Sequence, residues 1–449
     1  MSATTNALAT TKGKIRFSIV AMLFAVTIVN YADRASIAIA GPVMSKALGL
    51  SPVQMGFVFS AFGWSYVAGQ IPGGWLLDRF GSKAVYFWSI FLWSIFTVLV
   101  GTVGLAGAAA VYVLFLLRLL VGLAEAPSFP ANSRIVAAWF PANERGTASA
   151  IFNSAQYFAT VLFAPIMGFI TSTFGWPEVF YFMGGVGIVV SLIWLKVVYG
   201  PTDHPRLGRE ELEYIERGGA LVNMDRPAAS RVDMSTGTQL NYIGQLLQNR
   251  MMIGIFLGQF CINAITYFFI TWFPVYLVQQ RGMSVLNAGF VASIPAICGF
   301  LGGVLGGVWS DLLLRRKWSL TSARKTPIVA GMLMSMAMVI CNYVDAAWIV
   351  VLIMAIAFFG KGVGALGWAV VSDTVPREVA GLSGGLFNMF GNISSITTPI
   401  VIGYIIETTG SFNGALVFVA ANAAVAIVSY LVIVGEIRRV ALRHPQVAV

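Results

Sequence analysis

The sequence Gly-Trp-Leu-Leu-Asp-Arg-Phe-Gly-Ser-Lys at residues 74–83 ends one long apolar stretch. A shorter version of it, Gly-Val-Trp-Ser-Asp at residues 307–311, ends another, and the aspartates of the two copies are 233 residues apart. A second motif, Phe-Asn, occurs at 152–153 and again at 387–388, 235 residues later. Two unrelated motifs that repeat at nearly the same offset indicate that the chain consists of two halves related by duplication.

The composition is that of a membrane protein. The chain is 58% hydrophobic and 10% charged, with a mean hydropathy of +0.81, whereas soluble domains carry about 25% charged residues. Apolar stretches of roughly 20 residues, the length that crosses a bilayer, recur about twelve times. They are expected to be helices, because only helices and closed barrels satisfy the backbone in lipid. The predicted spans are residues 17–41, 53–77, 84–104, 108–131, 146–170, 178–199, 250–278, 287–313, 326–343, 347–372, 380–406 and 413–435.

We therefore expect an all-α membrane protein with twelve transmembrane helices in two pseudo-symmetric six-helix bundles, residues 1–199 and 250–449. Duplicated halves with a site between them are a plan of secondary transporters. Residues 200–249 are polar and carry both signs of charge, which predicts a cytoplasmic linker. A tether without chemistry is the alternative interpretation of this segment.

Within the linker, the pattern predicts one short surface helix over Arg209–Arg217. Leu212 and Ile215 are expected to be its apolar contacts.

The formal net charge of +10 does not predict a nucleic-acid partner, because its distribution follows the membrane. Basic residues concentrate in both tails, the linker and alternate loops, whereas the opposite loops hold only Lys46 and Arg281. This is the positive-inside bias of membrane proteins. It predicts that both termini lie in the cytoplasm.

Five ionisable residues lie deep inside the predicted spans: Asp33, Arg34, Arg118, Glu125 and Lys361. A charge at a helix centre in the bilayer costs about 2.5–3.5 kcal/mol even on lenient scales, so it persists mainly where it faces a polar cavity and has a function. Three buried cations and two buried acids suggest a carrier for organic anions that is coupled to protons.

Arg34 and Arg118 are the predicted carboxylate binders, since a guanidinium matches a carboxylate with two parallel hydrogen bonds. Asp33 and Glu125 are the predicted proton carriers, because both histidines of the chain lie outside the spans. In the expected mechanism, the acids hold the arginines in the empty carrier, and protonation of an acid releases a cation to the substrate. The alternatives are a structural salt bridge for each arginine and a static counter-ion for each acid.

Lys361 is the predicted discriminating residue. It lies in the half opposite to the two arginines, among Gly360, Gly362 and Gly364, which let backbones approach and leave room for a ligand. A third cation there suits a substrate with a carboxylate at each end. The alternatives are a lysine paired with a buried acid such as Asp33, or one that snorkels to an interface.

Five uncharged residues within the spans are candidates for binding a polyhydroxylated cargo: Tyr31, Tyr66, Gln156, Trp368 and Asn388. Tyr31 is three residues before Arg34, and Trp368 is seven residues after Lys361, so each is expected to share the helix face of its charged neighbour. Hydrogen bonding between helices is the alternative role for such residues.

Four charged residues at the predicted cytoplasmic helix ends are expected to control conformation rather than to bind substrate: Asp78, Arg79, Lys83 and Asp311. Asp78 can meet a basic partner or the positive end of a helix and hold one state. Asp311 should act likewise in the second half. The alternative is that these residues only fix the topology.

Several strings resemble those of a known family. The signature at 74–83 resembles the loop motif of the major facilitator superfamily. Asn-Tyr-Ala-Asp-Arg at 30–34 and Glu-Ala-Pro-Ser-Phe-Pro-Ala-Asn-Ser-Arg at 125–134 are similar to the anion:cation symporter family within it. The strings at 360–368 and 201–205 look closer still to bacterial glucarate/galactarate permeases.

The resemblance implies a monomer in the bacterial inner membrane that imports a hexarate with protons by alternating access. It also carries substrate binding onto Arg34 and Arg118, and it supports the roles of Tyr31, Tyr66, Gln156 and Asn388. Alternative cargoes are monocarboxylate sugar acids such as galactonate or a hexuronate. Alternative classes are a proton-independent facilitator or exchanger and a non-transporting sensor.

The sequence predicts no enzyme and no cofactor. It holds no phosphate-binding Gly-Lys-Ser/Thr loop, no metal motif and no evident nucleophile–base pair. The expected partners are therefore an organic anion, protons and the lipid bilayer.

Overall fold

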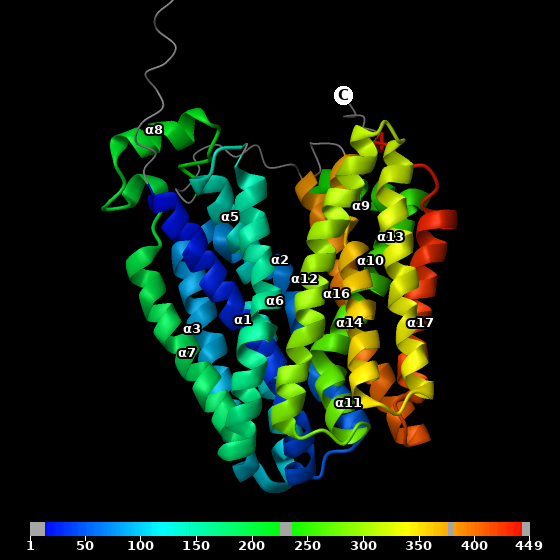
Figure 1. Ribbon diagram of the computed structural model, residues 1–449. Helices are drawn as coiled ribbons and strands as arrows, with labels where there is room; N and C mark the ends of the chain where they lie inside the picture. Colours follow the sequence, from blue (N-terminus) through cyan, green and yellow to red (C-terminus); the bar gives the residue numbers. More distant parts are fainter. Residues whose placement is uncertain (1–13, 143, 225–235, 376–379, 442–449) are drawn as a thin grey trace, which may run out of the picture.

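The computed structural model describes residues 14–142, 144–224, 236–375 and 380–441, and within these ranges the chain is helical with no strand (Figure 1). Eleven helical segments of the described residues are long and apolar enough to cross a membrane, so the chain is a multi-pass membrane protein. The remaining predicted span is α2 (Pro52–Phe80), a helix of 29 residues and about 43 Å at 1.5 Å per residue. It is not among the eleven by hydropathy, and it packs against α4 and α16.

The first half of the chain places α1 against α6 and α7, and α3 against α7 and α4. Its helices are α1 (Ile15–Leu48), α2, α3 (Ser82–Val100), α4 (Ala110–Glu125), α5 (Ser128–Trp139), α6 (Arg145–Thr173) and α7 (Trp176–Val197).

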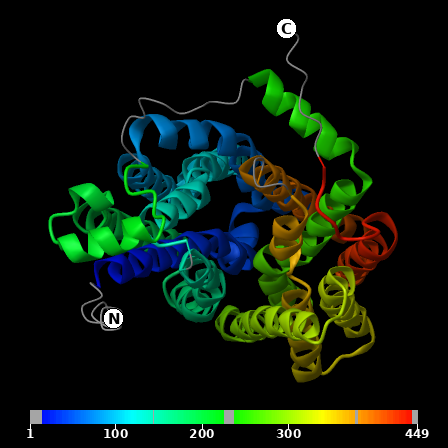
Figure 2. The same cartoon turned by 90° about the horizontal axis from the view of Figure 1, so that it is seen from above.

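The second half places α12 against α14, α10 against α16, and α13 against α14 and α17. Its helices are α10 (Arg250–Tyr267), α11 (Phe273–Gln279), α12 (Val285–Arg315), α13 (Leu320–Met336), α14 (Ala347–Val363), α15 (Gly367–Thr374), α16 (Ala380–Thr409) and α17 (Asn413–Val428). Seen along the helices, these form one group in green to red beside the blue and cyan group of the first half (Figure 2). The exact domain boundaries at 199 and 250 stay predictions.

Between the halves lie α8 (Arg209–Arg217) and α9 (Thr236–Gln248). The predicted short helix is confirmed, with Ile215 fully buried and Leu212 partly buried. We call the end of the molecule that carries α8 and α9 the linker end (Figure 1).

The first part of the linker is attached to the first half and is not a simple tether. Arg145 Nη2 donates to the carbonyl of Gly219 at 2.6 Å, and the Leu221 amide donates to the carbonyl of Ala137.

A buried ion-pair network fixes α8 itself. Arg16, which is 1% exposed at the start of α1, pairs with Glu144 at 3.1 Å and with Glu211 of α8 at 3.3 Å. Tyr214 of α8 donates a hydrogen bond of 2.6 Å to Glu144. Three elements that are distant in sequence therefore meet at one buried guanidinium.

Non-helical residues interrupt two of the predicted spans, at 126–127 and at 364–366. The span over 108–131 ends α4 at Glu125 and begins α5 at Ser128, because Pro127 cannot donate a backbone hydrogen bond within a continuing helix. The span over 347–372 ends α14 at Val363 and begins α15 at Gly367. These are the fourth and tenth spans, which correspond to each other in the duplication.

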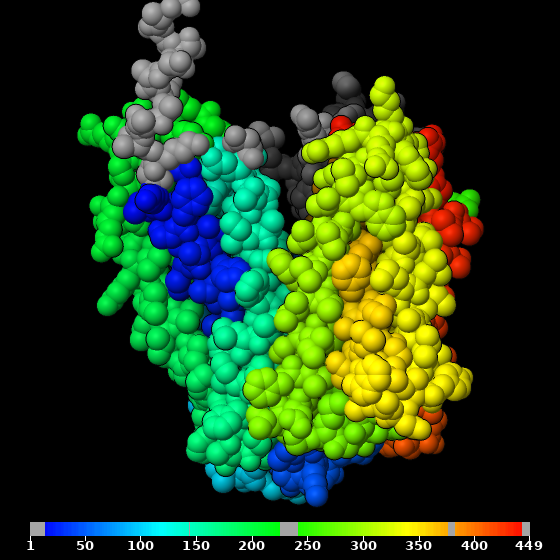
Figure 3. Space-filling model, viewed as in Figure 1, coloured from blue at the N-terminus to red at the C-terminus, as the bar shows by residue number. Residues whose placement is uncertain are grey.

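The two halves touch at the end opposite to the linker end. An added Cβ on Gly56 of α2 would lie 2.6 Å from the carbonyl oxygen of Pro399, which shows how closely α2 and α16 pack. Ser51 and the amide of Val53 both donate to the carboxylate of Glu407, at 2.7 and 2.8 Å. At the linker end, the space-filling surface is hollowed between the halves (Figure 3). The structure is therefore closed between the halves at one end and open at the other.

Candidate functional site

The centre of the site is an ion pair between α1 and α4. Arg34 Nε lies 2.8 Å from Glu125 Oε2, with side-chain exposures of 7% and 0%. The partner of Arg34 thus comes from another helix. A buried pair of this kind is costly to break by removing one member, about 3–5 kcal/mol.

Aromatic rings enclose the Arg34 guanidinium. Its carbon lies 4.9, 4.5 and 4.7 Å from the ring centroids of Tyr31, Phe62 and Tyr66. Two of these rings, those of Tyr31 and Tyr66, were predicted from the sequence, whereas Phe62 was missed because it carries no polar group. Cation–π contacts hold the charge in a poorly hydrated place, where it attracts an anion more strongly than it would in water.

Arg34 and Glu125 each keep an atom that could form a further hydrogen bond. Within the described part of the chain, Arg34 Nη2 and Glu125 Oε1 are buried and have no hydrogen-bond partner. One donor and one acceptor are thus free beside the ion pair, and buried polar atoms of this kind are normally satisfied. The site can therefore accept an anion on the arginine or a proton on the acid.

Asp33 and Arg118 form a second buried acid–cation set next to the first. Each is 2% exposed, and the charges of the two interact. Both Asp33 carboxylate oxygens and Arg118 Nε lack hydrogen bonds among the described residues, as do the side chains of Asn30 and Thr97. Sequence reasoning missed Asn30 and Thr97, whose only signal was a polar side chain within an apolar stretch.

The break in the fourth span places Glu125 at the C-terminus of a helix. It is the last residue of α4, and the C-terminus of a helix disfavours a negative charge by typically 0.3–1 kcal/mol. The cation from α1 offsets this cost, so the carboxylate depends on Arg34 for its stability as an ion.

Lys361 lies in the last turn of α14, where the helix dipole favours a cation. It is 5% exposed, and its Nζ lies 5.3 Å from the ring centroid of Phe358 and 5.8 Å from that of Tyr157. Because Tyr157 belongs to α6, the lysine lies against the first half across the interface. Among the described residues Lys361 forms no ion pair, so the alternative of a pair with Asp33 receives no support.

The glycines beside Lys361 serve close packing. A Cβ on Gly360 would lie 2.5 Å from the carbonyl oxygen of Gly331 on α13, and one on Gly362 would overlap with the carbonyl of Gly299 on α12. The expectation that these glycines let backbones approach is confirmed. The α14 backbone is thereby fixed between α12 and α13, which fixes the base of the lysine side chain.

Trp368 does not share the face of Lys361, and that prediction is wrong. The helix stops between Val363 and Gly367, so the spacing of seven residues no longer sets the relative direction. Trp368 is 53% exposed and packs edge-on against Phe387 at 4.9 Å.

Asn388 takes part in a chain of hydrogen bonds across the interface. Its Nδ2 donates to Gln70 of α2 at 3.1 Å, and its Oδ1 accepts from Asn392 at 3.1 Å. Asn392 in turn accepts from the hydroxyl of Tyr267 at 2.7 Å. The sequence analysis identified only Asn388 of these residues, since nothing in a single helix reveals partners on two others.

Gln156 is half-buried on α6, next to the Tyr157 that faces Lys361. Its Nε2 donates to the carbonyl of Asn153 at 3.1 Å, and its oxygen forms no recorded hydrogen bond among the described residues.

The four residues predicted to control conformation do not act as one group. Asp78 pairs with Arg134 of α5, and Asp311 pairs with Arg324 of α13 at 3.4 Å. Each acid is thus tied to a helix of its own half, and the two arginines were not predicted as partners.

The basic members of that set contact aromatic rings instead. The Arg79 guanidinium lies 5.4 Å from the ring centroid of Trp75, and Lys83 Nζ lies 3.1 Å from that of Tyr199. In the described ranges, no group of three or more His, Cys, Asp or Glu side chains could hold a metal ion.

These features define a class: a multi-pass helical membrane protein with duplicated halves and a buried charged site whose members come from both halves. The chain belongs to the Major Facilitator Superfamily, whose family model matches residues 23–323. It is 66% identical over 429 residues to the probable galactarate/D-glucarate transporter GudP of Escherichia coli (strain K12), with 95% of each chain covered.

A more distant relative is the D-galactonate transporter of Escherichia coli O6:H1, which is 39% identical over 428 residues and covers 95% of this chain and 97% of its own. Among solved structures, a D-xylose-proton symporter superposes with a TM-score of 0.69 at 16% identity, covering 94% of this chain and 98% of the other. This last likeness concerns the fold alone. The family and these relatives, which are named as transporters, confirm that the chain is not an enzyme.

Proposed function

We propose that this protein imports a sugar diacid such as D-glucarate or galactarate together with protons, by alternating access across the bacterial inner membrane. The observation that carries the proposal is the buried Arg34–Glu125 pair. From the other half, Lys361 lies against the interface and has no ion pair with the described residues. The name of the 66% identical relative supports the cargo.

The proposed cycle exchanges partners at Arg34. Protonation removes the charge of Glu125, and the guanidinium then takes a substrate carboxylate through its free Nη2 donor. Asp33 and Arg118 act as a second such set. Lys361 binds the other carboxylate, so the diacid joins the two halves.

Tyr31, Tyr66, Gln156 and Asn388 are proposed to contact the hydroxyls of the cargo. Exposed Trp368 is proposed to border the hollow between the two halves rather than to lie beside Lys361.

In this proposal the linker end is cytoplasmic, as the basic loops predict, and the structure corresponds to the inward-open state. The two bundles of residues 1–199 and 250–449 then rock about the site as a monomer. Asp78, Arg79, Lys83 and Asp311 stabilise helix ends within each half during that motion.

The test is uptake of labelled glucarate into proteoliposomes under a pH gradient. Glu125→Gln should abolish accumulation driven by the gradient while sparing exchange of glucarate between the two sides, because the amide cannot carry a proton. Accumulation at the wild-type level in this variant would refute proton coupling through Glu125.

The second candidate function is transport of monocarboxylate sugar acids, which the 39% identical D-galactonate transporter favours. Lys361→Ala separates the two. For a diacid carrier, glucarate uptake should fall at least tenfold and galactonate should compete poorly in the wild type. Strong competition by galactonate with little effect of the substitution would favour the second candidate.

A further inference from the structure

A cavity of about 770 Å³ lies at the linker end of the second half, away from the charged site. Its walls are the beginning of α10 and the chain that follows α17, and the residues that matter for its chemistry are Arg250, Met251, Val432, Glu436, Arg438 and Arg439. None of the residues of the charged site lines it. It is therefore separate from the charged site.

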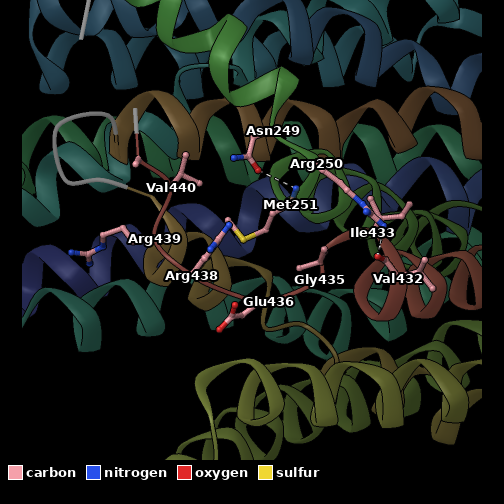
Figure 4. A pocket seen from close by; sticks show the side chains of 12 residues that line it. Asn249, Arg250, Met251, Val432, Ile433, Gly435, Glu436, Arg438, Arg439 and Val440 are labelled. Carbon is pink, nitrogen blue, oxygen red and sulfur yellow. Dashed lines mark hydrogen bonds between the residues drawn. The ribbon is translucent and has the colours of Figure 1, made fainter. Parts of the chain in front are cut away.

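The cavity is cationic. Three arginines and one glutamate line it, and Figure 4 shows Arg438 extending toward Met251, Arg439 extending the opposite way and Glu436 pointing to the other side of the chain. Arg250 Nη2 donates to the carbonyl of Val432 at 3.0 Å, which fixes this arginine on the wall. Arg438 and Arg439 are exposed and form no hydrogen bond or ion pair with the described residues. Their guanidinium donors are thus available to a ligand.

The cavity also borders the apolar outer surface. Val428, Leu431 and Val432 are 54%, 54% and 59% exposed on the last two turns before it. Apolar side chains so exposed on a membrane-spanning helix face lipid tails. One ligand could then lie along the apolar helix face and place a charged group among the arginines.

The wall is held in place over the end of the second half. The Ile437 amide donates to Thr321 Oγ1 at 2.9 Å, and the Val440 amide donates to the carbonyl of Thr374 at 2.7 Å. The arginines are therefore carried by a segment that is tied to α13 and α15.

We propose that this cavity binds the phosphate group of an anionic glycerophospholipid, with the acyl chains lying along Val428 and Leu431. Arginine donors match phosphate oxygens with paired hydrogen bonds, and basic pockets between membrane helices on the cytoplasmic side suit anionic headgroups. The lipid would join α10, α17 and the segment that ties them to α13. This inference does not depend on the identity of the cargo.

The experiment measures thermal unfolding of the purified full chain in detergent with added phosphatidylglycerol, phosphatidylcholine or inorganic phosphate. Phosphatidylglycerol should raise the unfolding temperature by several degrees over phosphatidylcholine. Arg438→Gln with Arg439→Gln should lose this rise without changing the unfolding temperature in detergent alone, since neither side chain has a partner in the described chain. Arg250→Gln, tested separately, should reduce the rise.

The matched control is Arg315→Gln with Arg316→Gln, which removes two exposed cations at the same end of the molecule. It should keep the full rise. The inference is overturned if the control loses the rise equally, which would indicate diffuse surface charge. It is also overturned if inorganic phosphate alone reproduces the rise, or if the wild type shows none.

Discussion

At Arg34, one guanidinium contacts an acid from another helix and three aromatic rings at the same time. Its charge is surrounded by the carboxylate of Glu125 and by the rings of Tyr31, Phe62 and Tyr66. The residues of its own helix alone could not provide this environment. The planar shape of the side chain is what allows this combination, because a ring can cover its face while its edge forms hydrogen bonds. The site therefore requires the planar shape of arginine at position 34 as well as its positive charge.

Arg34→Lys should test this specification. The ammonium keeps the charge but loses the planar fork, so the affinity for glucarate should fall roughly 10- to 100-fold, as expected for about 1.5–3 kcal/mol of charged hydrogen bonding. Equilibrium binding of labelled glucarate to purified protein measures the loss. Arg79→Lys, at an exposed arginine outside the site, is the control, and equal affinities for Arg34→Lys and wild type would contradict the argument.

At the scale of the element, the broken tenth span positions Lys361 by backbone packing. Gly360 and Gly362 contact α13 and α12 so closely that a methyl group has no room. A helix held in this way cannot rotate, so the lysine keeps its direction toward the interface between the halves.

Gly362→Ala should disturb this packing. Overpacking costs typically 1–3 kcal/mol, so the unfolding temperature in detergent should fall by several degrees and glucarate affinity should fall with it. Gly307→Ala is the matched control, because a Cβ at Gly307 on α12 meets nothing within 4 Å. A fall of the same size in both variants would show that helix glycines in general, rather than this contact, are responsible.

The linker helix α8 is an element whose attachment can be tested separately. Glu211→Gln removes one of the carboxylates that pair with buried Arg16, and loss of a buried partner costs about 3–5 kcal/mol. Amide hydrogen exchange over residues 209–217 should accelerate at least tenfold.

Glu216→Gln, at an exposed position on the same helix, should leave hydrogen exchange over α8 unchanged. Unchanged exchange in Glu211→Gln as well would mean that apolar contacts such as that of Ile215 hold α8 without the ion pairs.

Sequence reasoning succeeded where the signal is local. The helix over Arg209–Arg217 follows from the spacing of Leu212 and Ile215, and the duplication follows from repeated strings. It failed where the outcome depends on contacts between distant segments. The break after Val363 and the partners Arg134 and Arg324 required knowing which helices pack together, and no single stretch of sequence contains that information.

At the scale of the whole molecule, the site lies between the two halves, which are in contact from the site to the end opposite to the linker end. Contacts such as Ser51–Glu407 and Gly56–Pro399 close the end opposite to the linker. Asn388 and Gln70 meet across the interface. A motion that opens the closed end must break these contacts, so occupancy of the site and the arrangement of the halves are linked.

Lys361, which pairs with no acid in the described part of the chain, affects how the transport cycle responds to membrane voltage. With the acids ionised, Asp33, Arg34, Arg118, Glu125 and Lys361 sum to one positive charge in the empty carrier. A dianion with one proton makes the loaded site neutral, so the empty return step alone moves charge through the membrane field, at about 2.3 kcal/mol per charge per 100 mV. An inside-negative voltage, imposed with potassium and valinomycin, should then lower the accumulation of glucarate. Two protons per dianion would make the whole cycle electroneutral and leave the accumulation ratio independent of voltage. Because Lys361 has no ion-pair partner among the described residues, the voltage dependence of glucarate accumulation would report the proton stoichiometry.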